Sequence, residues 1–187
     1  MQVVLVFFGM IASGKSTLAD RFARRHDLLY LNTDRVRKEL AGLDPTERRP
    51  DGIDQGIYTA EFTRRTYDAM LARTTESLAE GRGVVLDGSY SRRGERDAVR
   101  TCAARAGAPV HFILCTCEDE TVAERLALRA RDPEAVSDGR WEIYLHQKDN
   151  FDWPDDNEQV LVLHTEDTPH HLEQKVESWL RAMQPPV

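Results

Sequence analysis

The stretch that decides the fold lies near the N-terminus and reads Gly9-Met10-Ile11-Ala12-Ser13-Gly14-Lys15-Ser16. It matches the pattern G-x-x-x-x-G-K-[ST], in which glycines let the backbone curl tightly around an anion. An apolar run, Val3–Phe8, precedes it, and an amphipathic stretch, Lys15–Arg25, follows. A strand, a loop and a helix in this order bring the positive end of the helix to the anion. The stretch therefore predicts a phosphate-binding loop after a first strand.

The residue types in this loop also predict how a polyphosphate and its metal are held. Lys15 is expected to reach the β- and γ-phosphates, and the Ser16 hydroxyl to ligate Mg²⁺. A second apolar strand ends in a carboxylate, Asp87, which is expected beside the magnesium shell unless it only caps the following segment. The residues expected to hold the phosphates are Gly9, Ala12, Ser13, Gly14, Lys15, Ser16 and Thr17.

Short apolar runs alternate with amphipathic stretches along the whole chain. The runs are Val3–Phe8, Leu28–Leu31, Val84–Leu86, Val110–Cys115 and Val160–Leu163. The expected helices are Lys15–Arg25, Asp34–Leu40, Ala60–Glu80, Arg93–Ala106, Glu118–Ala130, Gly139–Asn150 and Thr168–Ala182. Continuous apolar runs are typical of strands that are covered on both faces. The alternation predicts an α/β fold with a parallel sheet wrapped by helices.

Length and composition restrict the class of protein. The 187 residues suit one domain spanning 1–187, and 30% charged residues with a net charge of −7 argue against a broad nucleic-acid surface. The three cysteines lack a second pair with metal spacing, and their odd number fits a reducing compartment. The first apolar run is too short to span a bilayer, and no secretion signal is visible. We expect a cytoplasmic protein, and the sequence does not specify its oligomeric state.

Asp34 is the candidate general base. It follows the strand Leu28–Leu31, at the edge of the sheet where the phosphate loop also lies. Arg37 is three residues further on, so both side chains project from one face of the same helix. Together they can hold an acceptor hydroxyl and steady a polar or anionic substrate. The alternative for Asp34 is a first-turn acid that only complements the helix dipole.

Arginines in two other segments are candidate contacts for the nucleotide or the substrate. Arg125 and Arg129 are four residues apart in a predicted helix, where they can close over the nucleotide or belong to a solvated face. Arg92, Arg93 and Arg96 follow Asp87 and are either substrate contacts or surface charges.

The segment Gly42–Gly56 has no hydrophobic periodicity and contains two prolines and three glycines. A loop of this length in a compact domain is often functional, and the alternative is a surface excursion.

At these residues the sequence resembles the small P-loop kinases that group with zeta toxins, chloramphenicol phosphotransferase, gluconate kinase and polynucleotide kinase. It resembles most the predicted AAA-type kinases that are sometimes fused to aminoglycoside-phosphotransferase-like domains. The resembling segments are 9–17, 32–38, 86–90, Glu124-Arg125-Leu126 and Arg129, of which only the first is specific by itself. The resemblance implies a five-stranded sheet of order 2-3-1-4-5 with the phosphate-loop strand in the middle. It also implies ATP as phosphate donor, Asp34 as general base, Arg37 on the substrate side, and Arg125 or Arg129 in a helical lid at about 118–140.

These observations favour an ATP- and Mg²⁺-dependent kinase that phosphorylates a hydroxyl of a small polar molecule, such as a sugar or an antibiotic. Two alternatives stay open. A 5′-hydroxyl polynucleotide kinase is favoured by Asp34 with Arg37 and disfavoured by the net charge of −7. A non-catalytic ATP-dependent switch protein would bind nucleotide without using an acceptor. The sequence does not identify the acceptor.

Overall fold

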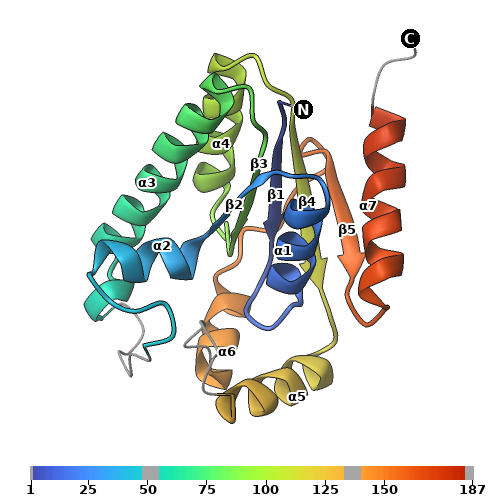
Figure 1. The fold of residues 1–187 in the computed structure, drawn as a ribbon. Helices are drawn as coiled ribbons and strands as arrows, with labels where there is room; N and C mark the ends of the chain where they lie inside the picture. The colour runs from blue at the N-terminus through green and yellow to red at the C-terminus, as the bar shows by residue number, and fades with distance from the viewer. Residues whose placement is uncertain (1, 48–54, 133–139, 184–187) are drawn as a thin grey trace.

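The computed structural model describes residues 2–47, 55–132 and 140–183 of the chain. Within them, the strands form one parallel sheet of order β2-β3-β1-β4-β5 (Figure 1). The strands are β1 (Val4–Phe8), β2 (Leu29–Asn32), β3 (Val84–Gly88), β4 (Val110–Thr116) and β5 (Val160–His164). The predicted parallel sheet, its strand order and its class, the P-loop NTPase fold, are confirmed.

Helices connect the strands in the alternation that the sequence predicts. They are α1 (Lys15–Arg25), α2 (Thr33–Leu40), α3 (Ala60–Ala79), α4 (Arg93–Arg105), α5 (Asp119–Ala130), α6 (Trp141–Asp149) and α7 (Pro169–Met183), with a 3₁₀ turn η1 (Gly56–Tyr58). All the predicted helices and strands are present, and their ends lie within two residues of the predicted ones. None of the helices in the described segments is long and apolar enough to cross a membrane.

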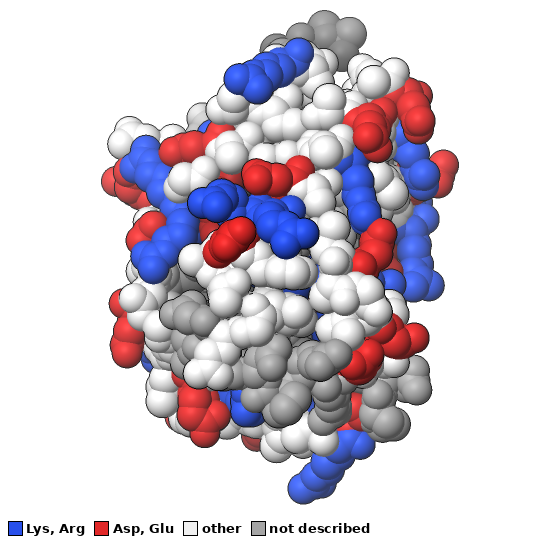
Figure 2. Space-filling view, turned by 90° about the vertical axis from the view of Figure 1, so that its left-hand side faces the viewer, with Lys and Arg blue, Asp and Glu red and all other residues white. Residues whose placement is uncertain are grey.

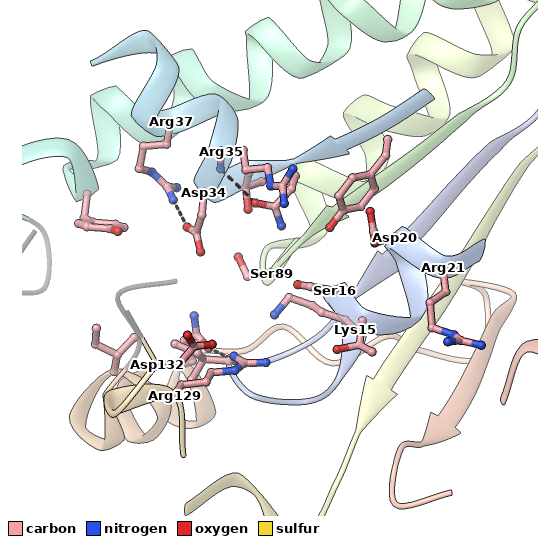
Figure 3. A pocket seen from close by; sticks show the side chains of 18 residues that line it. Lys15, Ser16, Asp20, Arg21, Asp34, Arg35, Arg37, Ser89, Arg129 and Asp132 are labelled. Atoms are coloured by element: carbon pink, nitrogen blue, oxygen red, sulfur yellow. Dashed lines mark hydrogen bonds and ion pairs between the residues drawn. The ribbon is translucent and has the colours of Figure 1, made fainter. Parts of the chain in front are cut away.

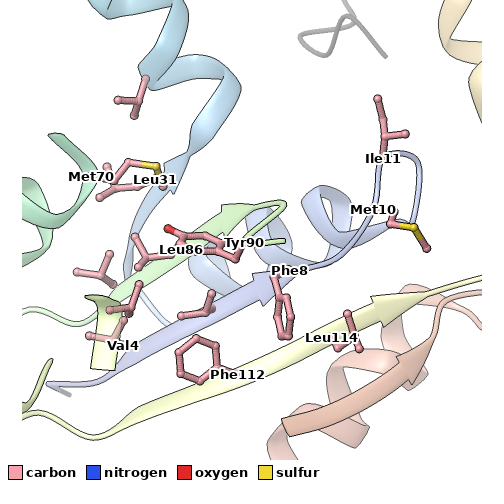
Figure 4. Close-up of a cluster of buried hydrophobic side chains, with 14 of the residues drawn as sticks. Val4, Phe8, Met10, Ile11, Leu31, Met70, Leu86, Tyr90, Phe112 and Leu114 are labelled. Atoms are coloured by element: carbon pink, nitrogen blue, oxygen red, sulfur yellow. The ribbon is translucent and has the colours of Figure 1, made fainter. Parts of the chain in front are cut away.

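Two apolar clusters sandwich the sheet, because all five residues of β1 are buried and alternate between its faces. Val4, Val6 and Phe8 join the cluster under α3 and α4, which Figure 4 shows. Leu5 and Phe7 join the cluster under α1 and α7. The result is a three-layer arrangement in which the central strand has no polar side.

The remaining helices gather at the edge where the parallel strands end (Figure 1). There α6 packs on the start of α5 through Asp119, which accepts hydrogen bonds from Tyr144 at 2.5 Å and Lys148 at 2.6 Å. The predicted lid at 118–140 therefore contains α5, while its residues 133–139 lie outside the described part. Residues 48–54 of the predicted loop also lie outside it, and η1 ends at Tyr58.

Candidate active site

The loop between β1 and α1 has a backbone that requires glycine at two positions. Gly9 has φ 140°, and a Cβ atom there would stand 2.3 Å from the carbonyl oxygen of Cys115. Gly14 has φ 82° and directly precedes α1. Backbone of this kind is open mainly to glycine. The first amides of α1 have no partners within the helix, so they are available to an anion held by the loop.

Two side chains that lie far from this loop in the sequence, Arg125 of α5 and Thr165 after β5, hold the loop on the side away from the cavity. The guanidinium of Arg125 donates to the carbonyl oxygen of Ala12 at 3.1 Å and to that of Thr165 at 2.7 Å. The Thr165 hydroxyl donates to the carbonyl oxygen of Ser13 at 2.6 Å. These bonds hold the carbonyl groups of Ala12 and Ser13 on the side of the loop that faces α5 and β5. Arg125 thus lies behind the loop.

The inner side of the loop opens into a cavity of about 520 Å³ (Figure 3). Lys15 and Ser16 line it, and Lys15 Nζ donates to the carbonyl oxygen of Met10 at 3.2 Å. Asp34 lines the opposite wall and points across the cavity toward the loop. The geometry therefore places a lysine, a hydroxyl and a carboxylate around one space.

Asp87 is the penultimate residue of β3 and is completely buried. Its Oδ2 accepts hydrogen bonds from the Tyr30 hydroxyl at 2.6 Å and from Asn32 Nδ2 at 2.5 Å. Its Oδ1 is buried without a hydrogen-bond partner. Burial, together with the charge of Asp87, raises the pKa of Tyr30 above its ordinary range, so the phenol remains a donor.

This arrangement suits a magnesium ion that arrives with a nucleotide. Within the described segments, no group of three or more His, Cys, Asp and Glu residues is built to hold a metal by itself. Mg²⁺ usually takes one or two protein oxygens and completes its shell with phosphates and water. The Ser16 hydroxyl and the unpartnered Asp87 Oδ1 are oxygens of the required kind. The residues present therefore fit the ion.

Asp34 is positioned by the start of α2. Asn32 caps this helix, because its Oδ1 accepts a hydrogen bond from the backbone N–H of Arg35 at 3.0 Å. One turn further, Arg37 Nη1 donates to Asp34 Oδ1 at 2.9 Å. The Arg37 guanidinium is buried and lies 4.9 Å from the ring centre of Tyr58. The predicted pairing of Asp34 and Arg37 on one helix face is present. The ring of Tyr58 packs against the Arg37 guanidinium and also lines the cavity.

Of the two arginines predicted for the lid, Arg129 lines the cavity. Burial lowers its pKa, and the nearby charge of Arg125 lowers it further, whereas Asp87 and Asp34 act in the opposite direction. An anion in the cavity would stabilise this guanidinium. Arg129 also lines a second cavity of about 400 Å³, formed with Gly14, Thr17 and Thr165 on the other side of the loop.

Sequence reasoning missed several residues of this site. Gln147 of α6 accepts a hydrogen bond on Oε1 from the backbone N–H of Ile11 at 2.7 Å, across 136 residues of sequence. Ser89 falls within the resembling segment 86–90 but had no role assigned to it; it lines the cavity, and its hydroxyl lies 3.2 Å from that of Tyr67. Single glutamines and serines carry no pattern that would have identified them. Arg96, a candidate substrate contact, is fully buried and binds Glu158.

With this geometry established, comparison with known proteins gives the family. A family model described as an AAA domain matches residues 4–154. The chain belongs to the AAA domain family. The matched residues include the loop, Asp34, Asp87, Arg125 and Arg129, but not Thr165, which also donates to a loop carbonyl.

Two curated relatives and one solved structure resemble this AAA domain. An uncharacterized protein of Mycobacterium tuberculosis is 29% identical over 126 residues, which are 65% of this chain and 24% of that protein. An adenylate kinase of Synechococcus is 27% identical over 150 residues, covering 76% of this chain and 79% of the enzyme. A sugar kinase from Janibacter has the same fold, with a TM-score of 0.73, 19% identity, and coverage of 98% and 96% of the two chains. The AAA domain thus spans about a quarter of the mycobacterial relative.

Proposed function

We propose that this protein is an ATP- and Mg²⁺-dependent kinase that transfers the γ-phosphoryl group to a hydroxyl of a small polar molecule, with Asp34 as general base. One observation carries the proposal. Lys15 of the phosphate loop and Asp34 of α2 face each other across the same cavity. A phosphate donor held at the loop and an alcohol held at Asp34 would therefore meet inside it.

The nucleotide is expected to extend along both sides of the loop. Its phosphates belong at the first amides of α1 with Lys15, and its base fits the second cavity, which Arg129 and Thr17 share with the first. Ser16 and Asp87 would hold the magnesium ion, directly or through water. When bound, the ion neutralises charge on the β- and γ-phosphates. Arg129 lies where it can stabilise the charge of the transferred group.

The transfer requires one proton acceptor. The hydroxyl oxygen of the substrate forms a bond to the γ-phosphorus while the bond from that phosphorus to the β–γ bridging oxygen breaks. The hydroxyl proton passes to Asp34, and ADP leaves with the bridging oxygen. Arg37 holds Oδ1 of Asp34, which leaves Oδ2 for the proton. Lys15 and Arg129 neutralise negative charge on the group in transit.

The chemistry of the acceptor wall favours an alcohol over a phosphate. Adenylate kinases, which the chain resembles at 27% identity, use a nucleotide phosphate as acceptor. A phosphate acceptor needs no general base, whereas an alcohol needs a group such as Asp34 to accept its proton. The cavity of about 520 Å³ is of the size that encloses a small ligand, and Ser89 and Tyr58 add polar groups to its wall. These features support a small hydroxylated substrate.

The 5′-hydroxyl polynucleotide kinase remains a second candidate because Asp34 and Arg37 are paired beside the cavity. A single-stranded nucleic acid would also need a basic track for its backbone. Figure 2 shows Lys and Arg mixed with Asp and Glu over the described part of the face that holds α3. The described part of this face therefore offers no continuous basic track.

The test is a screen for a phosphorylated product by ³¹P NMR with Mg²⁺-ATP. The panel contains sugars, polyols and hydroxylated antibiotics, together with AMP and a 5′-hydroxyl oligonucleotide. We expect a phosphate ester of a small molecule that is lost with Asp34→Asn. If only AMP or only the oligonucleotide is phosphorylated, the proposed small-molecule acceptor is wrong. Nucleotide binding with no transfer to any compound, and no effect of Asp34→Asn, would favour the switch protein.

A further inference from the structure

The carboxylate of Asp87 is held in an asymmetric environment. Its Oδ2 receives two hydrogen bonds, and its Oδ1 receives none although it is equally buried. A buried, charged oxygen without a partner is costly, and such atoms mark places where a ligand or an ion completes the site. The asymmetry is produced by the two donors, Tyr30 and Asn32.

Both donors come from the edge strand β2. They are two residues apart, so their side chains lie on the same face of the sheet. In the parallel pairing of β2 and β3, Asn32 lies directly beside Asp87. The hydroxyl and the amide therefore reach the same carboxylate oxygen, Oδ2, and Oδ1 is left without a hydrogen-bond partner.

The Asn32 amide is fixed at both ends. Its Nδ2 donates to Asp87, and its Oδ1 accepts from the first turn of α2, the helix that carries Asp34. This one side chain thus connects the buried carboxylate to the helix of the candidate base. A rotation of the amide would break both contacts at once.

We propose that Tyr30 and Asn32 are positioning residues that keep Asp87 Oδ1 directed at the hydration shell of the nucleotide-bound magnesium ion. The inference rests on the proposed function for the identity of the ligand. Both residues also line the cavity, and the proposal assigns their polar groups to Asp87 and not to the acceptor. Partners that orient a metal-binding carboxylate typically contribute about 10- to 100-fold to metal affinity.

The test measures ADP binding by isothermal titration calorimetry, once with Mg²⁺ and once with EDTA, in the full chain. Tyr30→Phe removes a single hydroxyl, and Asn32→Ser removes the donor to Asp87 while keeping a residue that caps helices well. The Mg²⁺-dependent gain is the ratio of ADP affinity in Mg²⁺ to ADP affinity in EDTA. We expect this ratio to be about tenfold smaller in each variant, and the affinity in EDTA to stay within about twofold of the unmodified protein. Thr101→Val is the control, because it also removes a hydroxyl that donates a hydrogen bond, but on the exposed side of α4 and outside the cavity.

The outcomes separate this inference from the proposed function. If the unmodified protein binds ADP and both variants keep its full Mg²⁺-dependent gain, the inference is wrong and the kinase proposal stands. Equal losses of affinity in Mg²⁺ and in EDTA would show a merely structural role and would also overturn it. If the unmodified protein binds no ADP in either buffer, the proposed function fails, and the inference fails with it.

Discussion

Arg37 Nη1 donates to Asp34 Oδ1 at 2.9 Å, one helical turn along α2, and the guanidinium of this pair is buried. The bond fixes the rotamer of Asp34, so the carboxylate reaches the cavity with one oxygen already occupied. It also provides a charge that opposes the negative charge of the nucleotide phosphates. The pair accounts for how an acid can stand close to a polyphosphate without expelling it.

Replacing Asp34 with Asn is expected to lower kcat by roughly 100-fold or more, because the amide cannot accept the proton of the acceptor hydroxyl. The affinity for Mg²⁺-ATP should change little, since Asp34 lies across the cavity from the loop. Steady-state kinetics and calorimetry measure the two quantities. An equal fall in both would assign Asp34 to nucleotide binding. Glu61→Gln on the exposed start of α3 is the control.

Replacing Lys15 with Ala is expected to reduce transfer by at least 100- to 1000-fold, roughly the cost of losing one group that stabilises transition-state charge. The cavity has no second lysine among its described wall residues. Product formation under saturating ATP tests this. Arg181→Ala, which removes an exposed charge from α7, should have no effect. Retained activity in Lys15→Ala would contradict the assigned role of the loop.

The two arginines of α5 should respond differently to replacement. Arg129→Ala is expected to lower kcat, because Arg129 lines the cavity in which we propose that the phosphoryl group is transferred. Arg125→Ala should chiefly weaken nucleotide binding, because its guanidinium connects the Ala12 carbonyl of the loop to the Thr165 carbonyl after β5. Separate measurements of kcat and of nucleotide affinity for both variants test the division. Identical profiles would refute it.

Gly9→Ala is expected to destabilise the protein and abolish nucleotide binding. A Cβ atom at Gly9 would meet the Cys115 carbonyl at 2.3 Å, and its φ of 140° is unfavourable for alanine. The control is Gly94→Ala in α4, where a Cβ meets nothing within 4 Å. That change should be neutral or raise stability by up to about 1 kcal/mol. Thermal unfolding measures the stability of both variants, and calorimetry measures their nucleotide binding. A stable Gly9→Ala protein that binds nucleotide would contradict the prediction.

Glu158 should make the stability of the protein sensitive to acid. Arg96 is the main cause that lowers the pKa of Glu158 from 4.5 to about 2, with help from Arg100. Because the pKa is lower in the folded state, this stabilisation is present above the unfolded pKa of 4.5 and is lost as the pH falls from there toward 2. Glu158→Gln should cost about 3 kcal/mol at neutral pH, because it leaves the buried Arg96 charge unpaired.

The measurement is urea unfolding of both proteins between pH 7 and pH 3. The stability difference between them should shrink as the pH falls. A difference that does not depend on pH would show that Glu158 acts through packing alone. Asp27→Asn, which breaks an exposed pair with Arg82, is the control and should cost little.

The elements of the fold could be predicted from the sequence because each depends on local patterns. The run Val84–Leu86 is apolar throughout, and the structure buries it on both faces. Periodicity could not place the polar contacts between elements. Arg96 was expected at a substrate or on the surface, yet it is buried over the ring of Phe8 and binds Glu158, which is 62 residues away. A charge pattern does not reveal a partner at that separation.

In the candidate site, too, the features that depend on local sequence could be predicted and the contacts between distant elements could not. The motif from Gly9 to Ser16 predicted the loop, because its spacing has one physical explanation. The bond between Gln147 and the Ile11 amide could not be predicted, since it depends on how α6 packs against α5. The roles of Asp34 and Arg129 remain predictions, although both line one cavity with Lys15.

The central position of β1 also bears on how the protein is made. Its neighbours in the sheet, β3 and β4, begin at Val84 and Val110, far downstream in the chain. A ribosome therefore releases the Val-Leu-Val-Phe-Phe segment long before either partner exists, and parallel pairing between distant segments forms slowly. Until β4 emerges, this segment is a natural target for chaperones, and a nascent chain carries its phosphate loop well before it can bind a nucleotide.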